Sequence, residues 1–448
     1  MVANYHVTII KHINKNNNNC KKERLGATMK EKLLHTPEGV RDIYNSECAT
    51  KLTLQDNLHH VLEHYGFRDI QTPSFEFFDI FSQERGTVAS KDMYKFFDRE
   101  GNTLVLRPDI TPSIARCAAK YYREENLPVR LGYIGNTFIN NTSYQGKLKE
   151  VTQLGAELIN DDSIEADAEM LALTIELLLQ SGLEQFQLEI GDADFFRALI
   201  DEAGFEEEEE VTRLRELIEK KNMFGVEEMI MTKDISMEQK EIFLKLSELF
   251  GTLDTLALAK KLTTNTRAIN AINRLEKLYD ILTDYGYENY VSFDLGMLSK
   301  YNYYTGIIFK AYTYGTGDAV ATGGRYDSLV GQFGKEAPAI GLVIVIDHLM
   351  LALSRQKLLV KPTAQDTLII YKTEYRKQAI ALANQFRKDK MNTILQKSKE
   401  GLDPEEYLSY AKRMTIGGIL YLDNGEEIKV VNIADGSVQS APMKEFLQ

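Results

Sequence analysis

The chain has 448 residues, of which 44% are hydrophobic and 27% are charged, and its formal net charge is −13 at pH 7. This length exceeds one ordinary hydrophobic core and predicts two or three domains. Proteins that bind nucleic acid usually carry a basic face or domain. The acidic composition removes the simplest electrostatic argument for such a partner, and none is expected.

Cysteine use and hydropathy exclude two further classes of protein. The three cysteines lie far apart and form no CxxC pair, so neither a disulfide framework nor a zinc ribbon is predicted. No run of about 18 apolar residues is present, so we expect no membrane-spanning helix. Residues 1–28 contain an asparagine run, which predicts a disordered leader. We expect a cytoplasmic protein that holds neither a metal ion nor a cofactor.

The first part of the chain predicts two helices, a hairpin and two long strands. Residues 46–65 place apolar side chains at helical spacing, and residues 111–123 are again helical. Residues 91–109 predict a hairpin with an aromatic first strand. Residues 128–140 and 150–159 predict two strands that pair antiparallel, because a short loop is enough to join them.

The second part predicts a helical insertion between strands. An apolar helix at 163–182 and a strand at 183–192 precede a charged helical segment at 194–285. The acidic run Glu206–Glu210 predicts a solvated helix face. Further strands are predicted at 289–298, 303–314 and 339–346, and the glycine-rich residues 316–327 separate the last two. A β-α-β rhythm then predicts a small α/β domain at 364–448.

Several motifs follow one another in a characteristic order. They are TPEGVRDI, LRPDITPSIAR, QLGAE, NYYTGIIF and GGRYD. Together they resemble histidyl-tRNA synthetase and its relatives over about residues 34–350, with a weaker resemblance over 364–448, and the synthetase-like domain is expected at residues 29–350. The resemblance implies an α+β fold of the class II aminoacyl-tRNA synthetase type: an antiparallel sheet of six or seven strands flanked by helices, with a helical insertion and a small C-terminal α/β domain.

The resemblance also implies that three arginines of the synthetases have been replaced. Ile139 and His348 stand where arginines bind ATP, and Ser299 stands where an arginine stabilises the reacting phosphate. Isoleucine cannot donate a hydrogen bond, whereas arginine engages phosphate oxygens through a planar fork. Losing one preorganised donor typically costs about 10²–10³ in rate. We therefore expect no synthetase activity, and no catalytic residue is assigned.

The residues for amino-acid binding are retained. Gln153 and Glu157 lie four apart on a predicted strand, so both side chains point to the same face. The resemblance implies that this pair faces the ammonium and the ring of histidine. It implies a histidine-binding pocket lined by Asp109, Thr111, Gln153, Glu157, Tyr303 and Tyr304.

These residues also admit simpler interpretations. Gln153 and Glu157 can form a solvated strand face. Tyr303 and Tyr304 alternate in the predicted strand, so one of them is expected to face away from any pocket. All histidines except His348 lie at or before position 64. No histidine pair is therefore expected in the body of the protein for a metal or acid–base role.

Retention of an amino-acid pocket without nucleotide chemistry suggests a sensor. The chain resembles the synthetase-like regulatory subunits that join a short-form ATP phosphoribosyltransferase catalytic subunit. The resemblance implies a non-catalytic subunit, required for the first step of histidine biosynthesis, through which histidine acts as inhibitory effector. It also implies a homodimer within a hetero-oligomer. An active histidyl-tRNA synthetase is the main alternative, and a synthetase-like module in another regulator is a third.

Overall fold

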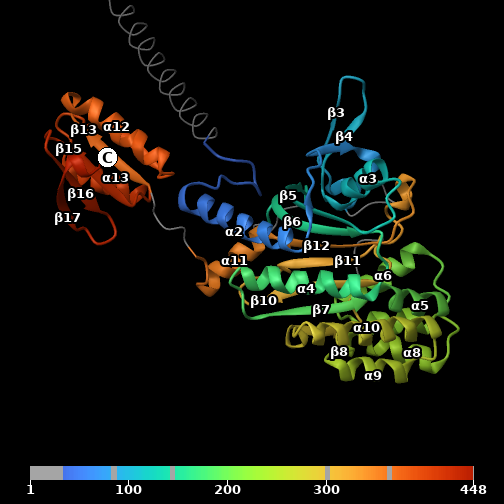
Figure 1. Cartoon of the computed structure of the whole chain (residues 1–448). Coiled ribbons are helices and arrows are strands. Elements are labelled where there is room, and N and C mark those ends of the chain that lie inside the picture. The colour runs from blue at the N-terminus through green and yellow to red at the C-terminus, as the bar shows by residue number, and fades with distance from the viewer. Residues whose placement is uncertain (1–33, 82–87, 142–146, 298–302, 361–365, 447–448) are drawn as a thin grey trace, which may run out of the picture. The chain divides into compact units, whose positions relative to one another are not determined.

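The computed structural model describes residues 34–81, 88–141, 147–297, 303–360 and 366–446 (Figure 1). The predicted leader at residues 1–28 lies outside these ranges, as does Ser299. The predictions for both therefore stay predictions.

The contacts between Cα atoms divide the chain into two compact units. Residues 57–357, with those before residue 43, form the larger unit, and residues 43–56 with 358–448 form the smaller one. Helix α2 (Asn45–His64) contributes residues to both units. None of the helices in the described ranges is long and apolar enough to span a membrane.

A mixed sheet forms the centre of the larger unit. Among the described residues its strand order is β1-β5-β6-β12-β11-β10-β7-β9-β8. The strands are β1 (Arg68–Asp69), β5 (Val129–Phe138), β6 (Glu150–Ile159), β7 (Phe186–Asp192), β8 (Phe250–Gly251), β9 (Val291–Asp294), β10 (Ile307–Thr313), β11 (Ala321–Arg325) and β12 (Ala339–Val345). Neighbours are antiparallel except for β1 with β5 and β7 with β9.

The α+β prediction is confirmed, but the sheet is larger than the expected six or seven strands. Within the described residues it has nine strands, and the two-residue strands β1 and β8 form its edges. Strand β11 lies in the glycine-rich segment that was predicted to separate two strands. Glycines have low strand propensity, but here they allow close packing: a Cβ on Gly323 would lie 2.2 Å from Cζ of Phe309.

The predicted pairing of β5 with β6 is confirmed. Their register places Gln153 opposite Gly135 and Glu157 opposite Leu131. On the other side of β6, Glu157 lies opposite Gly341 of β12. The side chains of β6 therefore project from the middle of the sheet, away from its solvent-exposed edges.

Three helices of the larger unit lie outside the helical insertion and pack close to the sheet. They are α3 (Thr111–Tyr121), α4 (Ile164–Gln180) and α11 (Ile346–Gln356). Helix α4 packs on β12 and helix α11 on β6. The hydroxyl of Ser163 accepts a hydrogen bond from the backbone N–H of Ala166 at 3.1 Å, which caps the start of α4.

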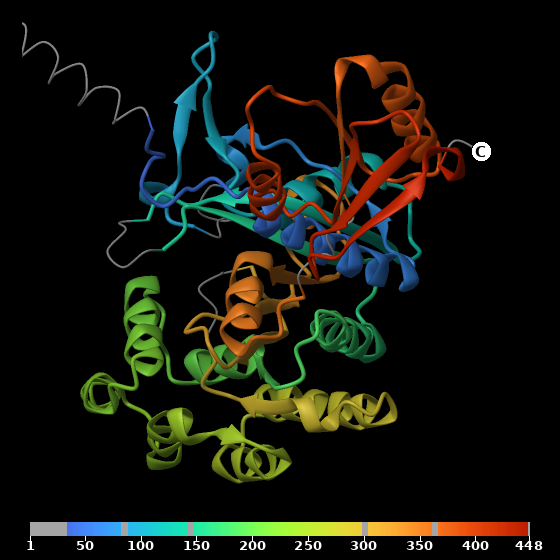
Figure 2. The same cartoon turned by 90° about the vertical axis from the view of Figure 1, so that its left-hand side faces the viewer.

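The insertion is helical, as predicted, apart from β8 and a short 3₁₀ turn. Its helices are α5 (Ala193–Glu202), α6 (Glu208–Glu219), α7 (Met223–Met231), α8 (Met237–Lys245), α9 (Leu253–Leu262) and α10 (Thr266–Asp284). They gather as one cluster, coloured green to yellow, in both views (Figures 1 and 2). The acidic run leads into α6 and is mostly exposed, as expected of a solvated face. Helix α10 packs on α4, α5 and β7, so it joins the insertion to the sheet.

A small three-stranded sheet confirms the predicted hairpin. It has the order β2-β4-β3, with β2 (Phe75–Phe77), β3 (Lys95–Phe97) and β4 (Thr103–Leu106) all paired antiparallel. At the turn, both carboxylate oxygens of Asp98 accept hydrogen bonds from Asn102 at 2.8 Å.

The smaller unit contains a second mixed sheet with the order β14-β13-β15-β16-β17. Its elements are β13 (Thr367–Tyr371), α12 (Arg376–Lys388), β14 (Thr393–Lys397), α13 (Pro404–Arg413), β15 (Gly418–Leu422), β16 (Glu427–Asn432) and β17 (Val438–Pro442). The predicted β13, α12 and β15 are present. Strands β14, β16 and β17 and helix α13 were not predicted. Helices α12 and α13 contribute to two separate apolar clusters around this sheet.

Candidate functional site

All six residues of the predicted pocket line one cavity in the larger unit. The lining comprises Asp109, Thr111, Gln153, Glu157, Tyr303, Tyr304, Thr322, Gly323, Gly324, Tyr326, Gly341 and Val343. We call this the tyrosine cavity. Segments that are far apart in the sequence meet here: the start of α3, strands β6, β11 and β12, and the residues before β10.

Two predicted residues come from the start of α3. One carboxylate oxygen of Asp109 accepts hydrogen bonds from the backbone N–H groups of Ile110 at 2.7 Å and Thr111 at 3.3 Å. These N–H groups open a helix and lack carbonyl partners within it. The carboxylate is therefore fixed by the helix, while the hydroxyl of Thr111 is directed at Glu157 across the cavity.

Glu157 is fully buried, so the interpretation as a solvated strand face is wrong for it. The hydroxyl of Thr111 donates to Oε1 at 2.8 Å, and the hydroxyl of Tyr326 donates to Oε2 at 2.5 Å. Burial raises the pKa of Glu157 to about 8, and the neighbouring Asp109 also raises it, although the two hydroxyls lower it. In the empty cavity Glu157 is therefore mostly a neutral acid at pH 7.

Glycines make the room for these buried polar groups. A Cβ on Gly341 would lie 1.9 Å from Oε2 of Glu157, closer than any non-bonded contact allows. A Cβ on Gly155 would lie 2.3 Å from the hydroxyl of Tyr133, which is also buried. Gly341 is therefore required for the carboxyl group of Glu157 to occupy its place in the sheet.

Both Tyr303 and Tyr304 face the cavity, so the expectation that one faces away is wrong. They precede β10 and are not part of it, and strand alternation does not apply to them. Their ring centroids lie 4.7 Å apart, and the Tyr303 ring lies 5.9 Å from that of Tyr326 in an edge-on arrangement. A Cβ on Gly324 would lie 2.7 Å from Tyr304, so this ring packs directly on the backbone of β11.

Gln153 contributes a buried acceptor. Its Oε1 has no hydrogen-bond donor among the described residues. A buried amide oxygen without a donor is costly, roughly 1–3 kcal/mol. The cavity volume is about 40 Å³, enough for a few water molecules at about 10–15 Å³ each. The amide oxygen is thus available to a ligand that supplies an N–H group.

The residues at the positions where the resemblance implies replaced arginines make other contacts. Ile139 is half-buried, and its backbone N–H donates to the carbonyl of Lys149 at 2.9 Å. His348, on α11, donates from Nδ1 to the carbonyl oxygen of Ala319 at 3.0 Å. Ser299 lies outside the described residues. Neither Ile139 nor His348 offers the bidentate donor that phosphate binding favours.

Sequence reasoning missed two important residues of the site. Tyr326 hydrogen-bonds the central carboxyl group, and it lies in the GGRYD motif that supported the resemblance, so a signal for it was present. Gly341 lies in the predicted last strand, and its role depends on a cross-strand neighbour. That contact becomes visible only once β6 and β12 are paired.

One group of side chains in the described residues could hold a metal ion, and its histidines lie before position 64, outside the part of the chain for which no histidine pair was expected. His59, His60 and Glu63 on α2 lie close together, outside the tyrosine cavity. His59 is hydrogen-bonded to Asp69 at 2.6 Å and His60 to Glu63 at 2.7 Å. These contacts account for the group without a metal ion.

Comparison with known proteins gives one consistent family. The family model for histidyl-tRNA synthetase matches residues 39–349. An ATP phosphoribosyltransferase regulatory subunit from Acetivibrio thermocellus is 41% identical over 420 residues, which cover 94% of this chain and 100% of that protein. The corresponding subunit from Ruminiclostridium cellulolyticum is 40% identical over 414 residues, covering 92% and 98%.

Solved structures agree with the sequence matches. A crystal structure from Bacillus halodurans, described as an ATP phosphoribosyltransferase regulatory subunit/histidyl-tRNA synthetase, has a TM-score of 0.77 and 31% identity, and the match covers 87% of this chain and 98% of that one. Histidyl-tRNA synthetase from Nostoc has a TM-score of 0.74 at 20% identity, covering 92% and 98%. The latter shows a shared fold alone.

Proposed function

The chain belongs to the family of ATP phosphoribosyltransferase regulatory subunits, which share the histidyl-tRNA synthetase fold, and we propose that it senses histidine in the tyrosine cavity. It acts with a separate, short-form catalytic subunit in the first step of histidine biosynthesis. Histidine bound to this chain lowers the activity of that subunit. The assembly is a hetero-oligomer that contains a dimer of this chain.

The observation that carries the proposal is the convergence of the retained polar residues on one cavity. Glu157, with two hydroxyl partners, and Gln153, with a buried amide oxygen, face the same space as Asp109. Histidine carries an ammonium group and a ring N–H, which are donors that these oxygen atoms can accept. The rings of Tyr303 and Tyr304, tilted by 51° to each other, provide apolar faces for an imidazole.

Histidine needs more room than the empty cavity provides, so binding requires a local rearrangement. The rings of Tyr303 and Tyr304 are the movable part of the wall, because the rest of the described lining, apart from Tyr326, belongs to strands and to the start of α3. Parting these rings opens the space above Gly324. Glu157 then gives up its proton when it meets a cationic group of the ligand.

The same chain does not catalyse aminoacylation. A synthetase must polarise ATP, and the described positions for that task hold Ile139 and His348. Their contacts are a backbone pairing and a hydrogen bond to a carbonyl oxygen, which contribute nothing to phosphate binding. The alternative, an active histidyl-tRNA synthetase, predicts histidine-dependent exchange between ATP and pyrophosphate. We expect none, and exchange at roughly 1 s⁻¹ or faster would overturn the assignment.

The inhibition experiment uses the complex with the catalytic subunit. Glu157→Ala removes one partner of a buried charged pair, which typically costs about 2–5 kcal/mol. We expect the histidine concentration for half-inhibition to rise by roughly 30-fold or more. The matched control is Glu228→Ala, which changes an exposed glutamate of α7 and leaves inhibition unaltered. Equal inhibition of wild type and Glu157→Ala would place the histidine site elsewhere.

A further inference from the structure

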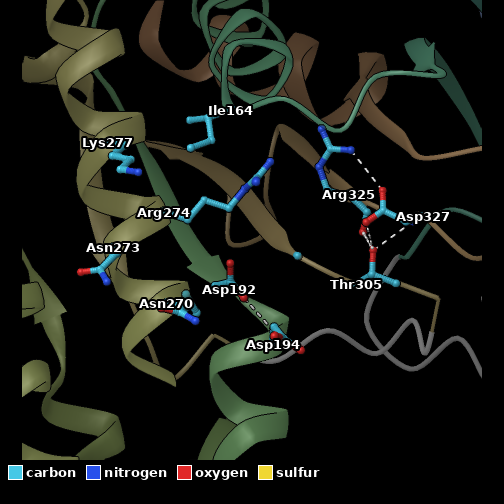
Figure 3. A pocket seen from close by; sticks show the side chains of 12 residues that line it. Ile164, Asp192, Asp194, Asn270, Asn273, Arg274, Lys277, Thr305, Arg325 and Asp327 are labelled. Carbon is cyan, nitrogen blue, oxygen red and sulfur yellow. Dashed lines mark hydrogen bonds and ion pairs between the residues drawn. The ribbon is translucent and has the colours of Figure 1, made fainter. Parts of the chain in front are cut away.

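A second and much larger cavity lies between the insertion and the sheet. Its volume is about 450 Å³, within the range of small-molecule sites. It is lined by Ile164, Asp192, Asp194, Asn270, Ala271, Asn273, Arg274, Lys277, Thr305, Gly306, Arg325 and Asp327 (Figure 3). We call it the charged cavity. It shares no lining residue with the tyrosine cavity.

One wall of the charged cavity is a fixed ion network. The fully buried carboxylate of Asp167 accepts from Nε of Arg325 at 2.8 Å on one oxygen and from Nε of Arg274 at 2.9 Å on the other. Arg325 is only 3% exposed and also contacts Asp327 at 3.1 Å. Because these groups satisfy one another, the wall is rigid and the guanidinium of Arg325 is already occupied.

Two charged groups at the cavity keep an unused hydrogen-bonding atom. Arg274 binds through Nε and one terminal nitrogen, and among the described residues its other nitrogen, Nη1, has no partner. Asp192 accepts backbone N–H groups of Asp194 at 2.7 Å and Phe195 at 3.3 Å on Oδ1 alone. Among the described residues, Oδ2 of Asp192 has no hydrogen-bond partner. Figure 3 shows both side chains reaching into the same space.

The state of Asp192 suits a role as a fixed anion. Asp192 is 3% exposed. Burial raises its pKa to about 6, while the backbone N–H groups and Arg274 lower the pKa. It is therefore mostly ionised at pH 7. Neither unused atom is among the fully buried polar atoms of the described residues without a partner, so both are accessible from the cavity to a ligand of complementary charge.

The charges around the cavity balance. Among the lining residues, Asp192, Asp194 and Asp327 are matched by Arg274, Lys277 and Arg325. A simple anion or cation would upset this balance. A ligand with separated charges and no net charge leaves it intact and satisfies both unused atoms.

We propose that the charged cavity binds a free α-amino acid, with its ammonium group at Asp192 and its carboxylate at Arg274 and Lys277. Asn270 and Asn273 of α10 line the same cavity and favour a polar side chain. Because the cavity lies between α10 and the sheet, bordered by β7, β11 and the residues before β10, an occupant ties the insertion to the sheet. The site does not depend on histidine sensing in the tyrosine cavity.

The test separates the two sites by using the Glu157→Ala chain, in which histidine sensing is impaired. Each of the twenty standard amino acids is added to this chain, first in a thermal-shift assay and then by calorimetry, with sodium phosphate and acetate as simple anions. We expect at least one polar amino acid to raise the melting temperature and to bind. No binding by any amino acid, or tighter binding of the simple anions, overturns the proposal.

Asp192→Asn is the decisive variant, because asparagine keeps the helix cap and removes the charge. We expect this variant to weaken amino-acid binding about tenfold or more. The wild-type chain should also lose affinity below pH 6, where Asp192 becomes protonated, and the variant should not show this loss. Asp280→Asn, on the exposed side of α10, is the matched control. Lys277→Gln at the rim is a second variant and weakens binding less. Unchanged affinity in Asp192→Asn, with a normal melting temperature, contradicts the assignment.

Discussion

Glu157 and Asp192 are both buried carboxyl groups that line cavities of the larger unit, yet their surroundings give them different charges. Glu157 receives two hydroxyl donors and lies near Asp109, and its pKa rises to about 8. Asp192 receives two backbone N–H groups near Arg274, and its pKa rises only to about 6. Burial acts on both, and the type of neighbour decides which of them is ionised at pH 7.

The two cavities also differ in how tightly they are packed. The tyrosine cavity has about 40 Å³ because aromatic rings lie flush against glycine backbone. The charged cavity has about 450 Å³ and is bordered by fixed ion pairs. We therefore expect the first to respond to changes in packing and protonation, and the second to changes in charge.

The largest effect is expected from filling the space beside Glu157. Gly341→Ala would place a Cβ within 1.9 Å of its carboxyl oxygen, so the carboxyl group must move or the strands must separate. We expect a loss of about 3 kcal/mol in the free energy of unfolding, which chemical denaturation measures. Histidine binding should also be lost, which calorimetry measures. Gly317→Ala is the control, since nothing lies within 4 Å of its Cβ. A Gly341→Ala chain that binds histidine normally would contradict the packing argument.

The next effect concerns the ionisation of Glu157. Its pKa is higher in the folded chain than the ordinary value of 4.5, so wild type loses stability as pH rises from about 4.5 to 8. Glu157→Gln cannot ionise and escapes this loss. We expect the variant to gain about 2 kcal/mol or more relative to wild type between pH 5 and pH 8.5. Denaturation curves of wild type and Glu157→Gln at both pH values check this. If the two chains differed in free energy of unfolding by the same amount at both pH values, the raised pKa would be ruled out.

A smaller effect with a different pH window is expected at Asp192. The folded-state pKa of about 6 lies above the ordinary value of 3.8, so the relative gain of Asp192→Asn should develop between about pH 4 and 6 and stay constant above that. Its size should be about 1–2 kcal/mol. The same denaturation series measures it. If the stability gains of Glu157→Gln and Asp192→Asn developed over the same pH range, the two carboxyl groups would not differ in pKa as described.

The smallest signal is the proton released when histidine binds. Because Glu157 is mostly neutral in the empty cavity at pH 7, meeting a cationic group should release a proton, approaching one per histidine bound. Calorimetry in buffers of different ionisation enthalpy measures this number. It should fall to near zero in Glu157→Gln. Equal release from both chains would assign the proton to another group.

Much of the site could be predicted because periodicity fixes which side chains share a face. Gln153 and Glu157 lie on one strand, and the motif order brought Asp109, Thr111 and the tyrosines to the same place. The orientation of Tyr303 and Tyr304 was predicted wrongly, because strand periodicity was extended past the start of β10. Strand β11 was missed because its glycines serve close packing across strands, which local propensity does not register.

Other properties depend on three-dimensional packing and could not be predicted. The neutral state of Glu157 results from complete burial, assisted by Asp109, and it persists although the hydroxyl of Tyr326, which is distant in the sequence, lowers the pKa. The charged cavity is assembled mainly from β7, α10, β11 and the residues before β10, and no motif links Asp192 with Arg274. A sequence pattern identifies the residue types, whereas cavity volume and pKa depend on the distances between them.

Calorimetric titration of histidine into the complex with the catalytic subunit tests the central claim most directly. The account predicts that Glu157→Ala binds histidine roughly 30-fold or more weakly than wild type, while Glu228→Ala binds it normally. The same weakening should appear in inhibition of the transferase. Equal affinity of the Glu157→Ala and wild-type complexes would contradict the account, because the histidine site would then lie outside the tyrosine cavity.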